Sequence, residues 1–324
     1  MKKRLHFFLR LLISIGVCLF LFWWMRDKIA NTFTALKMTN LRLFFIAFAV
    51  NLLGLMICSA RFKIVLFAQK IYFSLIEAIR LTFIGVFFNN FLPTSVGGDV
   101  VKGYYASQKT GRTLESFSAV VADRFVGLVT FVLIAFISFL LLGKYIDNQI
   151  RSVVLIVLSA VILVIVALLS KPLLKKIDFL LNKVPFFRRK SRLQRLTIIL
   201  QNYKKNRRAL YNAIVFSLIG QATYIITTYL LAQSLSLSIP LKMFFLFLPI
   251  ISTVSMLPSL NGLGIREGAY VYFFGSLTRP ENALALSFLW IAVLMGSSII
   301  GAIIYIIKEP LRKRVAQTIE TAEN

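Results

Sequence analysis

The chain has 324 residues, of which 58% are hydrophobic, and its mean hydropathy is +0.81. A composition this apolar excludes a soluble globular domain, because too few polar residues remain to cover a water-exposed surface. Basic residues outnumber acidic ones by 38 to 12, giving a net charge of +26. The basic residues fall mostly between the apolar segments, where they orient membrane proteins and contact anionic lipid headgroups. Nucleic acid is therefore not an expected partner.

The apolar segments predict an all-α polytopic membrane protein. A helix needs about 20 apolar residues to span the hydrocarbon layer. The segments that meet this requirement are 6–25, 43–60, 117–142, 150–170, 210–234 and 283–307. The first follows a basic N-terminus but lacks a small-residue cleavage site, so we expect a retained helix rather than a signal peptide. We expect residues 1–324 to form a single transmembrane domain.

Two further apolar regions, 72–106 and 241–277, each contain a Leu-Pro pair followed by glycines. Proline ends a helix, and glycine allows the backbone to turn and to approach a ligand closely. Each region therefore predicts a re-entrant or broken helical hairpin. The residues expected to break the helices are Pro93, Gly97, Gly98, Pro258, Gly262 and Gly264.

The placement of charge predicts how these hairpins enter the membrane. With a cytoplasmic N-terminus, counting 72–92 as one complete crossing would place the segment 171–208, which is rich in Lys and Arg, outside the cell, against the positive-inside bias. If 72–106 enters and leaves from the cytoplasm, then 171–208 is a basic cytoplasmic loop and both termini are cytoplasmic. The hairpin 241–277 then enters from the opposite side. The units 43–142 and 210–307 form an inverted repeat in this arrangement, as in many secondary transporters.

Charged residues near the two breaks predict a site for an anion. The helix after each break presents free N–H groups and the positive end of its dipole, and both favour negative charge. Ionisable groups inside a membrane are functional by default. Those expected to bind substrate, together with the helix-breaking residues, are Asp99, Lys102, Asp123, Arg124, Arg266 and Glu267.

Structural roles are the alternative for several of these side chains. Asp99 would cap the helix that it begins, and Lys102 would extend to the lipid headgroups. Ser259 or Asn261 would cap the helix after the second break.

Asp123 and Arg124 are neighbours, and adjacent residues on a helix diverge by about 100°. We therefore expect one of them to pair with another segment, with Asp99 and Glu77 as candidate partners for Arg124. Glu77 also has Arg80 three residues away on the same helix, which allows a local pair.

No pattern for catalysis, a cofactor or a metal is present in the sequence. The single histidine, His6, has no cysteine partner for a zinc site, and the sequence contains no P-loop. We expect neither a catalytic residue nor a cofactor.

The three motifs at 92–102, 123–124 and 257–267 resemble the lysylphosphatidylglycerol synthase transmembrane-region family, whose members are often called flippase-like membrane proteins. The resemblance covers nearly the whole chain. It implies a multi-pass protein of the cytoplasmic (inner) membrane that moves anionic or polyprenyl-linked lipids across the bilayer. The family often has arginine where Lys102 stands and glutamate where Asp123 stands. Bifunctional members add a soluble aminoacyl-transferase domain, which this chain does not carry, so lysyl transfer is not expected.

The leading hypothesis is a flippase or transporter that holds an anionic or polyprenyl-phosphate headgroup between the two hairpins while its two halves alternate access. Membrane lipids are then its partners. One alternative is a non-catalytic accessory subunit that recruits a lipid- or glycan-modifying enzyme through the loop 171–208. Another is a membrane-embedded transferase for lipid-linked substrates. The nearly acid-free loop argues against this last reading, because acid–base or metal chemistry needs acidic groups.

Overall fold

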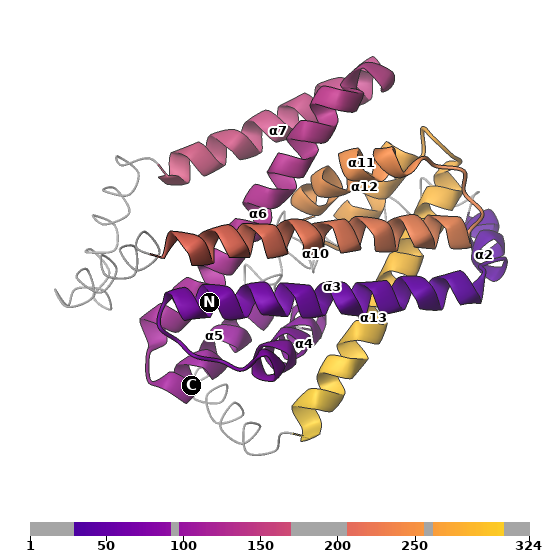
Figure 1. Ribbon diagram of the computed structural model, residues 1–324. Helices are drawn as coiled ribbons and strands as arrows, with labels where there is room; N and C mark the ends of the chain where they lie inside the picture. Colours follow the sequence, from indigo (N-terminus) through magenta and orange to yellow (C-terminus); the bar gives the residue numbers. More distant parts are fainter. Residues whose placement is uncertain (1–28, 92–96, 170–205, 256–261, 308–324) are drawn as a thin grey trace, which may run out of the picture.

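The computed structural model describes residues 29–91, 97–169, 206–255 and 262–307 (Figure 1). These ranges are helical, without strands, which confirms the predicted all-α class. The helices are α2 (Ile29–Lys37), α3 (Leu41–Ala68), α4 (Leu75–Phe91), α5 (Gly97–Thr110), α6 (Thr113–Leu142), η2 (Gly143–Tyr145), α7 (Asn148–Leu169), α10 (Arg207–Ser234), α11 (Leu241–Val254), α12 (Ile265–Phe274) and α13 (Pro280–Ile307). The expected helix 6–25, most of the loop 171–208, Pro93 and Pro258 lie outside the described ranges.

Among the described residues, four helices are long and apolar enough to cross a membrane: α3, α6 continued by η2, α10 and α13. They correspond to the segments predicted at 43–60, 117–142, 210–234 and 283–307. The segment predicted at 150–170 is also a helix, α7, of 22 residues. Large apolar side chains such as Leu53, Phe136 and Ile299 are exposed on these helices. Such a surface suits lipid rather than water.

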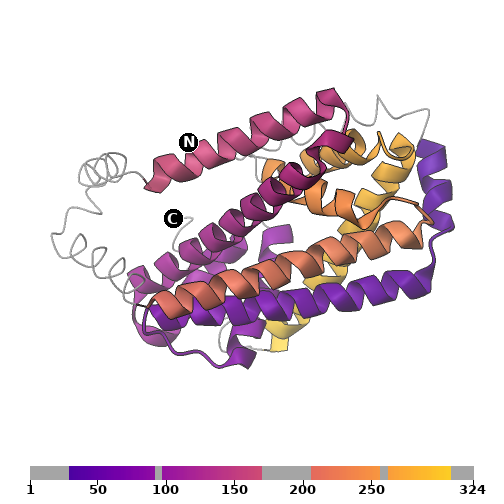
Figure 2. The same ribbon diagram turned by 45° about the horizontal axis from the view of Figure 1, so that its top comes forward.

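Helices α3 and α10 form an antiparallel pair that runs side by side in both views (Figures 1 and 2). The backbone N–H of Asn40, just before α3, donates to the carbonyl oxygen of Ser234, the last residue of α10, at 2.8 Å. Glycine allows the close contact, because a Cβ atom at Gly54 would lie 2.5 Å from Oγ1 of Thr223. The C-terminal end of each helix therefore lies at the opposite end of the molecule from the other.

Helices α4 and α5 form the first hairpin. Its open end is marked by an ion pair between Glu77, in the first turn of α4, and Lys109, in the last turn of α5. The structure thus pairs Glu77 across the hairpin, and not with Arg80 on its own helix. The ion pair shows that the start of α4 and the end of α5 lie side by side, as expected for a hairpin over 72–106.

The closed end of the first hairpin depends on glycine. A Cβ atom at Gly98 would lie 1.8 Å from the carbonyl oxygen of Gly85, so no side chain fits where α5 meets α4. The side chain of Asn89 accepts a hydrogen bond from the Gly98 N–H at 2.8 Å and satisfies one free donor at the start of α5. The predicted helix break therefore also brings two backbones into contact.

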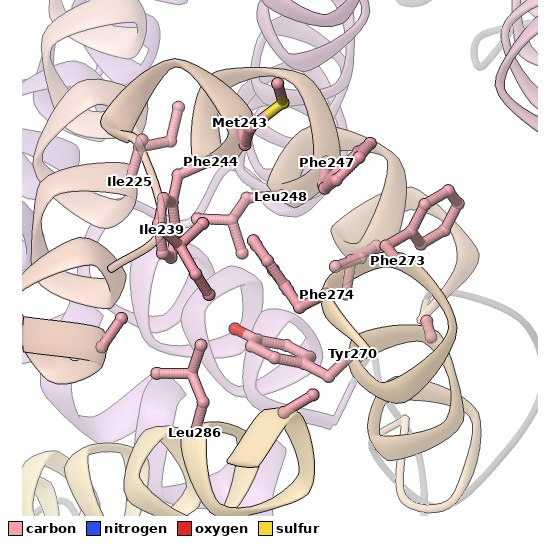
Figure 3. Packing of buried hydrophobic residues seen from close by; sticks show 14 of the residues in the cluster. Ile225, Ile239, Met243, Phe244, Phe247, Leu248, Tyr270, Phe273, Phe274 and Leu286 are labelled. Atoms are coloured by element: carbon pink, nitrogen blue, oxygen red, sulfur yellow. The ribbon is translucent and has the colours of Figure 1, made fainter. Parts of the chain in front are cut away.

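Helices α11 and α12 form the second hairpin, which is packed through aromatic rings (Figure 3). The ring centroids of Phe244 and Phe274 are 4.8 Å apart, and those of Phe247 and Phe273 are 5.3 Å apart. Phe244 lies near the start of α11 and Phe274 ends α12, so these two helices are also antiparallel. Tyr270 is fully buried in the same cluster.

The turn before α12 requires glycine at two positions. Gly262 and Gly264 have φ angles of 77° and 83°, which side chains rarely tolerate. Gly264 is the residue that precedes the helix, and its N–H donates to the Glu267 carboxylate. Ser259 and Asn261, the predicted caps, lie outside the described residues.

The two hairpins open at opposite ends of the molecule, because one follows the end of α3 and the other follows the end of α10. Their packing is reciprocal: α6 lies against α11 of the second hairpin, and α13 lies against α4 of the first. The longest hairpin helix, α4, has 17 residues and is about 26 Å long. It is shorter than the hydrocarbon layer of about 30 Å.

Candidate binding cavity

A cavity of about 310 Å³ lies between the two hairpins and receives residues from six helices. It is lined by Val86, Asn89 and Asn90 of α4, Arg124 and Phe131 of α6, Tyr224 of α10, Ile251, Ser252 and Ser255 of α11 and its end, Arg266 of α12, and Trp290 and Leu294 of α13. Two of these side chains are arginines, one from each predicted repeat unit. The remainder are aromatic, apolar or uncharged polar groups.

Arg124 forms an ion pair with Asp99, with Nε 2.5 Å from Oδ2. Asp99 is the third residue of α5 and is buried, whereas 46% of the Arg124 side chain is exposed. The prediction that one of the adjacent residues of α6 pairs with another segment is confirmed, and Asp99 rather than Glu77 is the partner of Arg124. The pair ties the first hairpin to α6.

Arg266 forms the corresponding pair with Glu267, and both side chains are buried. Its Nη2 and Nε lie 2.9 and 3.1 Å from Oε1 of Glu267, and the Ser287 hydroxyl lies 3.5 Å from the same oxygen. Glu267 is the third residue of α12, as Asp99 is of α5. Each hairpin thus supplies a carboxylate from the same position in its second helix.

The cavity wall contains the basic member of each ion pair. Arg124 and Arg266 both line it, whereas neither Asp99 nor Glu267 is among the lining residues. Glu267 offsets the cost of burying the Arg266 cation, whereas Arg124 pairs with Asp99 while nearly half of its own side chain is exposed. A guanidinium group offers five N–H donors in a planar fork that matches phosphate oxygens. The arrangement suits a negatively charged group in this cavity.

Asp123 has a different environment from its neighbour. Its carboxylate binds Arg61 of α3 at two points, Nε at 2.7 Å and Nη2 at 3.0 Å, and Nη1 of Arg61 donates to the Ser217 hydroxyl of α10 at 2.9 Å. This buried network joins α3, α6 and α10. Sequence reasoning missed Arg61 because α3 continues to Ala68, past the expected end at residue 60. The available signal was Asp123 itself, because an acid inside an apolar segment needs a basic partner.

The remaining predicted residues that the structure describes do not line the cavity. The ammonium group of Lys102 lies 5.5 Å from the centroid of the Phe62 ring, and its stem packs against Gly85. Gly97 begins α5, Gly98 forms its close contact with α4, and Gly262 and Gly264 belong to the turn before α12. Substrate binding by these residues stays a prediction.

A smaller compartment of about 180 Å³ adjoins the cavity. The two share Val86, Tyr224, Trp290 and Leu294. The rest of its wall comes from α3, α10 and α13: Asn51, Gly54, Leu55, Cys58, Gly220, Gln221, Thr223 and Ser297. No pattern of charge or helix breaks marks these residues in the sequence, and none was predicted.

Comparison with known proteins gives two matches. The model of the family described as lysylphosphatidylglycerol synthase TM region matches residues 7–301. A UPF0104 membrane protein of Pyrococcus horikoshii is 25% identical over 335 residues, a match that covers 93% of this chain and 97% of the relative. No solved structure matches the chain.

Proposed function

Because the chain belongs to the lysylphosphatidylglycerol synthase transmembrane-region family, we propose that this multi-pass membrane protein is a lipid transporter. It moves an anionic or polyprenyl-phosphate-linked lipid across the cytoplasmic membrane. The observation that carries the proposal is the pair of arginines, Arg124 and Arg266, which come from different halves of the chain and line one cavity. The acyl or prenyl chains stay in the bilayer while the headgroup occupies the cavity.

An inverted repeat is part of the proposal. The antiparallel contact of α3 and α10, the hairpins that open at opposite ends, and the reciprocal packing of α6 and α13 support it. In transporters of this type the substrate binds near the bilayer midplane between the repeats, and the broken helices form the site. One hairpin then faces the cytoplasm and the other faces the opposite side, with both chain termini cytoplasmic.

The ion pairs suggest how the site accepts and releases its ligand. Within the described residues, Glu267 engages two of the five N–H donors of Arg266, and a phosphate would use the others. A bound phosphate competes with Asp99 and Glu267 for the arginines. Since Asp99 lies on the first hairpin, this competition couples occupancy of the site to the contact between α5 and α6.

Transport is tested with the purified full chain in liposomes that contain fluorescent phosphatidylglycerol, a fluorescent polyprenyl phosphate or fluorescent phosphatidylcholine. A membrane-impermeant quencher measures how fast the inner-leaflet label becomes accessible. We expect transport of the anionic lipids. Arg124→Ala and Arg266→Ala should each slow it by about tenfold or more, the value of one lost charged hydrogen bond.

Arg42→Ala is the matched control, because Arg42 is exposed in the first turn of α3 and away from the cavity. This variant should transport at the wild-type rate. Wild-type liposomes that behave like empty ones for every anionic lipid would overturn the proposal. If Arg42→Ala slowed transport equally, the slowing by the other two substitutions could not be assigned to the cavity.

A further inference from the structure

The smaller compartment beside the arginine cavity has a largely apolar wall with a few hydrogen-bonding groups and no charged side chain. Its hydrogen-bonding side chains are Asn51, Gln221, Thr223 and Ser297. The Asn51 amide donates to the Ser297 hydroxyl at 3.0 Å, and the Gln221 amide lies 3.4 Å from the carbonyl oxygen of Gly127. These contacts hold the amide groups in place at the wall.

The depth of this compartment makes its hydrogen-bonding side chains unusual. Helices α3, α10 and α13 have 28 residues each, and the compartment touches each of them about half way along, at Gly54, Gly220 and Leu294. In a bilayer, this level is the hydrocarbon midplane, where polar groups are costly and typically serve a polar substrate. Packing alone would be satisfied by apolar side chains here.

We infer that the smaller compartment binds the uncharged polyol or sugar group that is joined through a phosphodiester to the lipid, while Arg124 and Arg266 hold the phosphate. This inference rests on the proposed transport function and specifies its substrate class. The volume of about 180 Å³ equals roughly six water molecules at about 30 Å³ each. It suits a small polyol or a single sugar ring.

The lack of carboxylates favours an uncharged group over an ammonium group, and the aromatic junction fits a sugar. No Asp or Glu is among the lining residues of either cavity within the described part of the chain, so no carboxylate there balances an added positive charge. The junction between the cavities is formed by Tyr224 and Trp290, whose ring centroids are 4.7 Å apart. Aromatic walls pack against the C–H faces of a sugar, and amide groups bond its hydroxyls.

The binding test uses soluble headgroup fragments and the purified full chain. Replacing Trp23 and Trp24 by Phe leaves Trp290, which lines both cavities, as the single tryptophan, and its fluorescence reports binding. The probes are glycerophosphoglycerol, glucose 1-phosphate, inorganic phosphate and phosphoethanolamine. We expect the polyol and sugar phosphates to bind about tenfold more tightly than the other two, from one or two added hydrogen bonds.

The Gln221→Leu variant separates the two compartments. It should weaken the binding of the polyol and sugar phosphates by about threefold to tenfold. The affinity for inorganic phosphate should stay unchanged, because the arginines remain. Gln233→Leu is the same substitution on the same helix, outside both cavities. It should change neither the affinity for the polyol and sugar phosphates nor that for inorganic phosphate. Equal affinity for all four probes, no saturable response, or equal loss in both variants would overturn the inference.

Transport of fluorescent phosphatidylglycerol and phosphatidic acid distinguishes this inference from the proposed function. Gln221→Leu should abolish a preference for phosphatidylglycerol while phosphatidic acid continues to move. If the fragments bind as expected and no lipid moves, the transport proposal fails and the binding site stands. If both lipids move equally in the wild-type protein, the polyol site fails and transport stands.

Discussion

At the scale of single residues, the pair of Arg61 and Asp123 is a buried ion pair whose two charges depend on each other. Arg61→Ala leaves a buried carboxylate without its cation, which costs about 3–5 kcal/mol. We therefore expect a large loss of thermal stability in detergent, measured by the unfolding midpoint. Lys109→Ala breaks the exposed pair with Glu77 and should cost at most about 1 kcal/mol. Equal losses in the two variants would contradict the assignment of Arg61 and Asp123 as a buried network.

The sequence predicted some residue contacts and missed others for physical reasons. The sequence narrowed the partner of Arg124 to Asp99 or Glu77, because few acids lie near an intramembrane arginine, and the structure identifies it as Asp99. The contact of Arg61 with Asp123 was not predicted, since an arginine at the expected end of an apolar segment resembles a headgroup-facing residue. Neutral side chains such as Gln221 carry no signal until the fold places them at a cavity wall.

At the scale of helices, the contact between α13 and α4 depends on Gly301. A Cβ atom there would lie 2.1 Å from the backbone carbonyl oxygen of Phe83, and neither backbone can yield without moving a helix. Gly301→Ala should therefore lower stability by about 1–3 kcal/mol, the range for overpacking, and reduce the yield of monodisperse protein in size-exclusion chromatography.

Gly296→Ala on the same helix is the matched comparison. Its Cβ atom would lie 2.9 Å from the ring of Phe48, a side chain that can rotate away, so we expect a smaller loss. If Gly296→Ala is the more damaging of the two, the close backbone contact at Gly301 is not what limits this packing.

Hydropathy located the long helices well, because a run of about 20 consecutive apolar residues matches the length of a membrane-spanning helix. It placed the hairpin helices less well. The helix α12 begins at Ile265, after a turn held by two glycines with positive φ, and proline position alone does not fix that start. The match between Asp99 and Glu267 as third residues of their helices appears only once these starts are known.

At the scale of the whole molecule, the opposite openings of the hairpins predict a topology. Arg112 precedes α6 beside the first hairpin, and Ser236 follows α10 before the second. Single cysteines at these positions, in a background with Cys18 and Cys58 replaced by serine, should react with an impermeant maleimide from opposite sides of the membrane.

A third cysteine, at Lys70, is the internal control for this labelling. The Arg112 side chain donates to the carbonyl oxygen of Lys70, so the two positions lie at the same end of the molecule. They should be labelled from the same side. Labelling of Arg112→Cys and Ser236→Cys from one side would remove the inverted repeat.

The pairing of α3 with α10 also bears on how the protein is made. The glycines at the centre of this contact, Gly54 and Gly220, are separated by more than 150 residues. At a synthesis rate of about 5–20 residues per second, α3 resides in the membrane for roughly 10–30 s before its partner emerges. During that interval its small-residue face meets lipid or an insertion factor. The early half of the chain is therefore exposed to quality control until the late half is inserted.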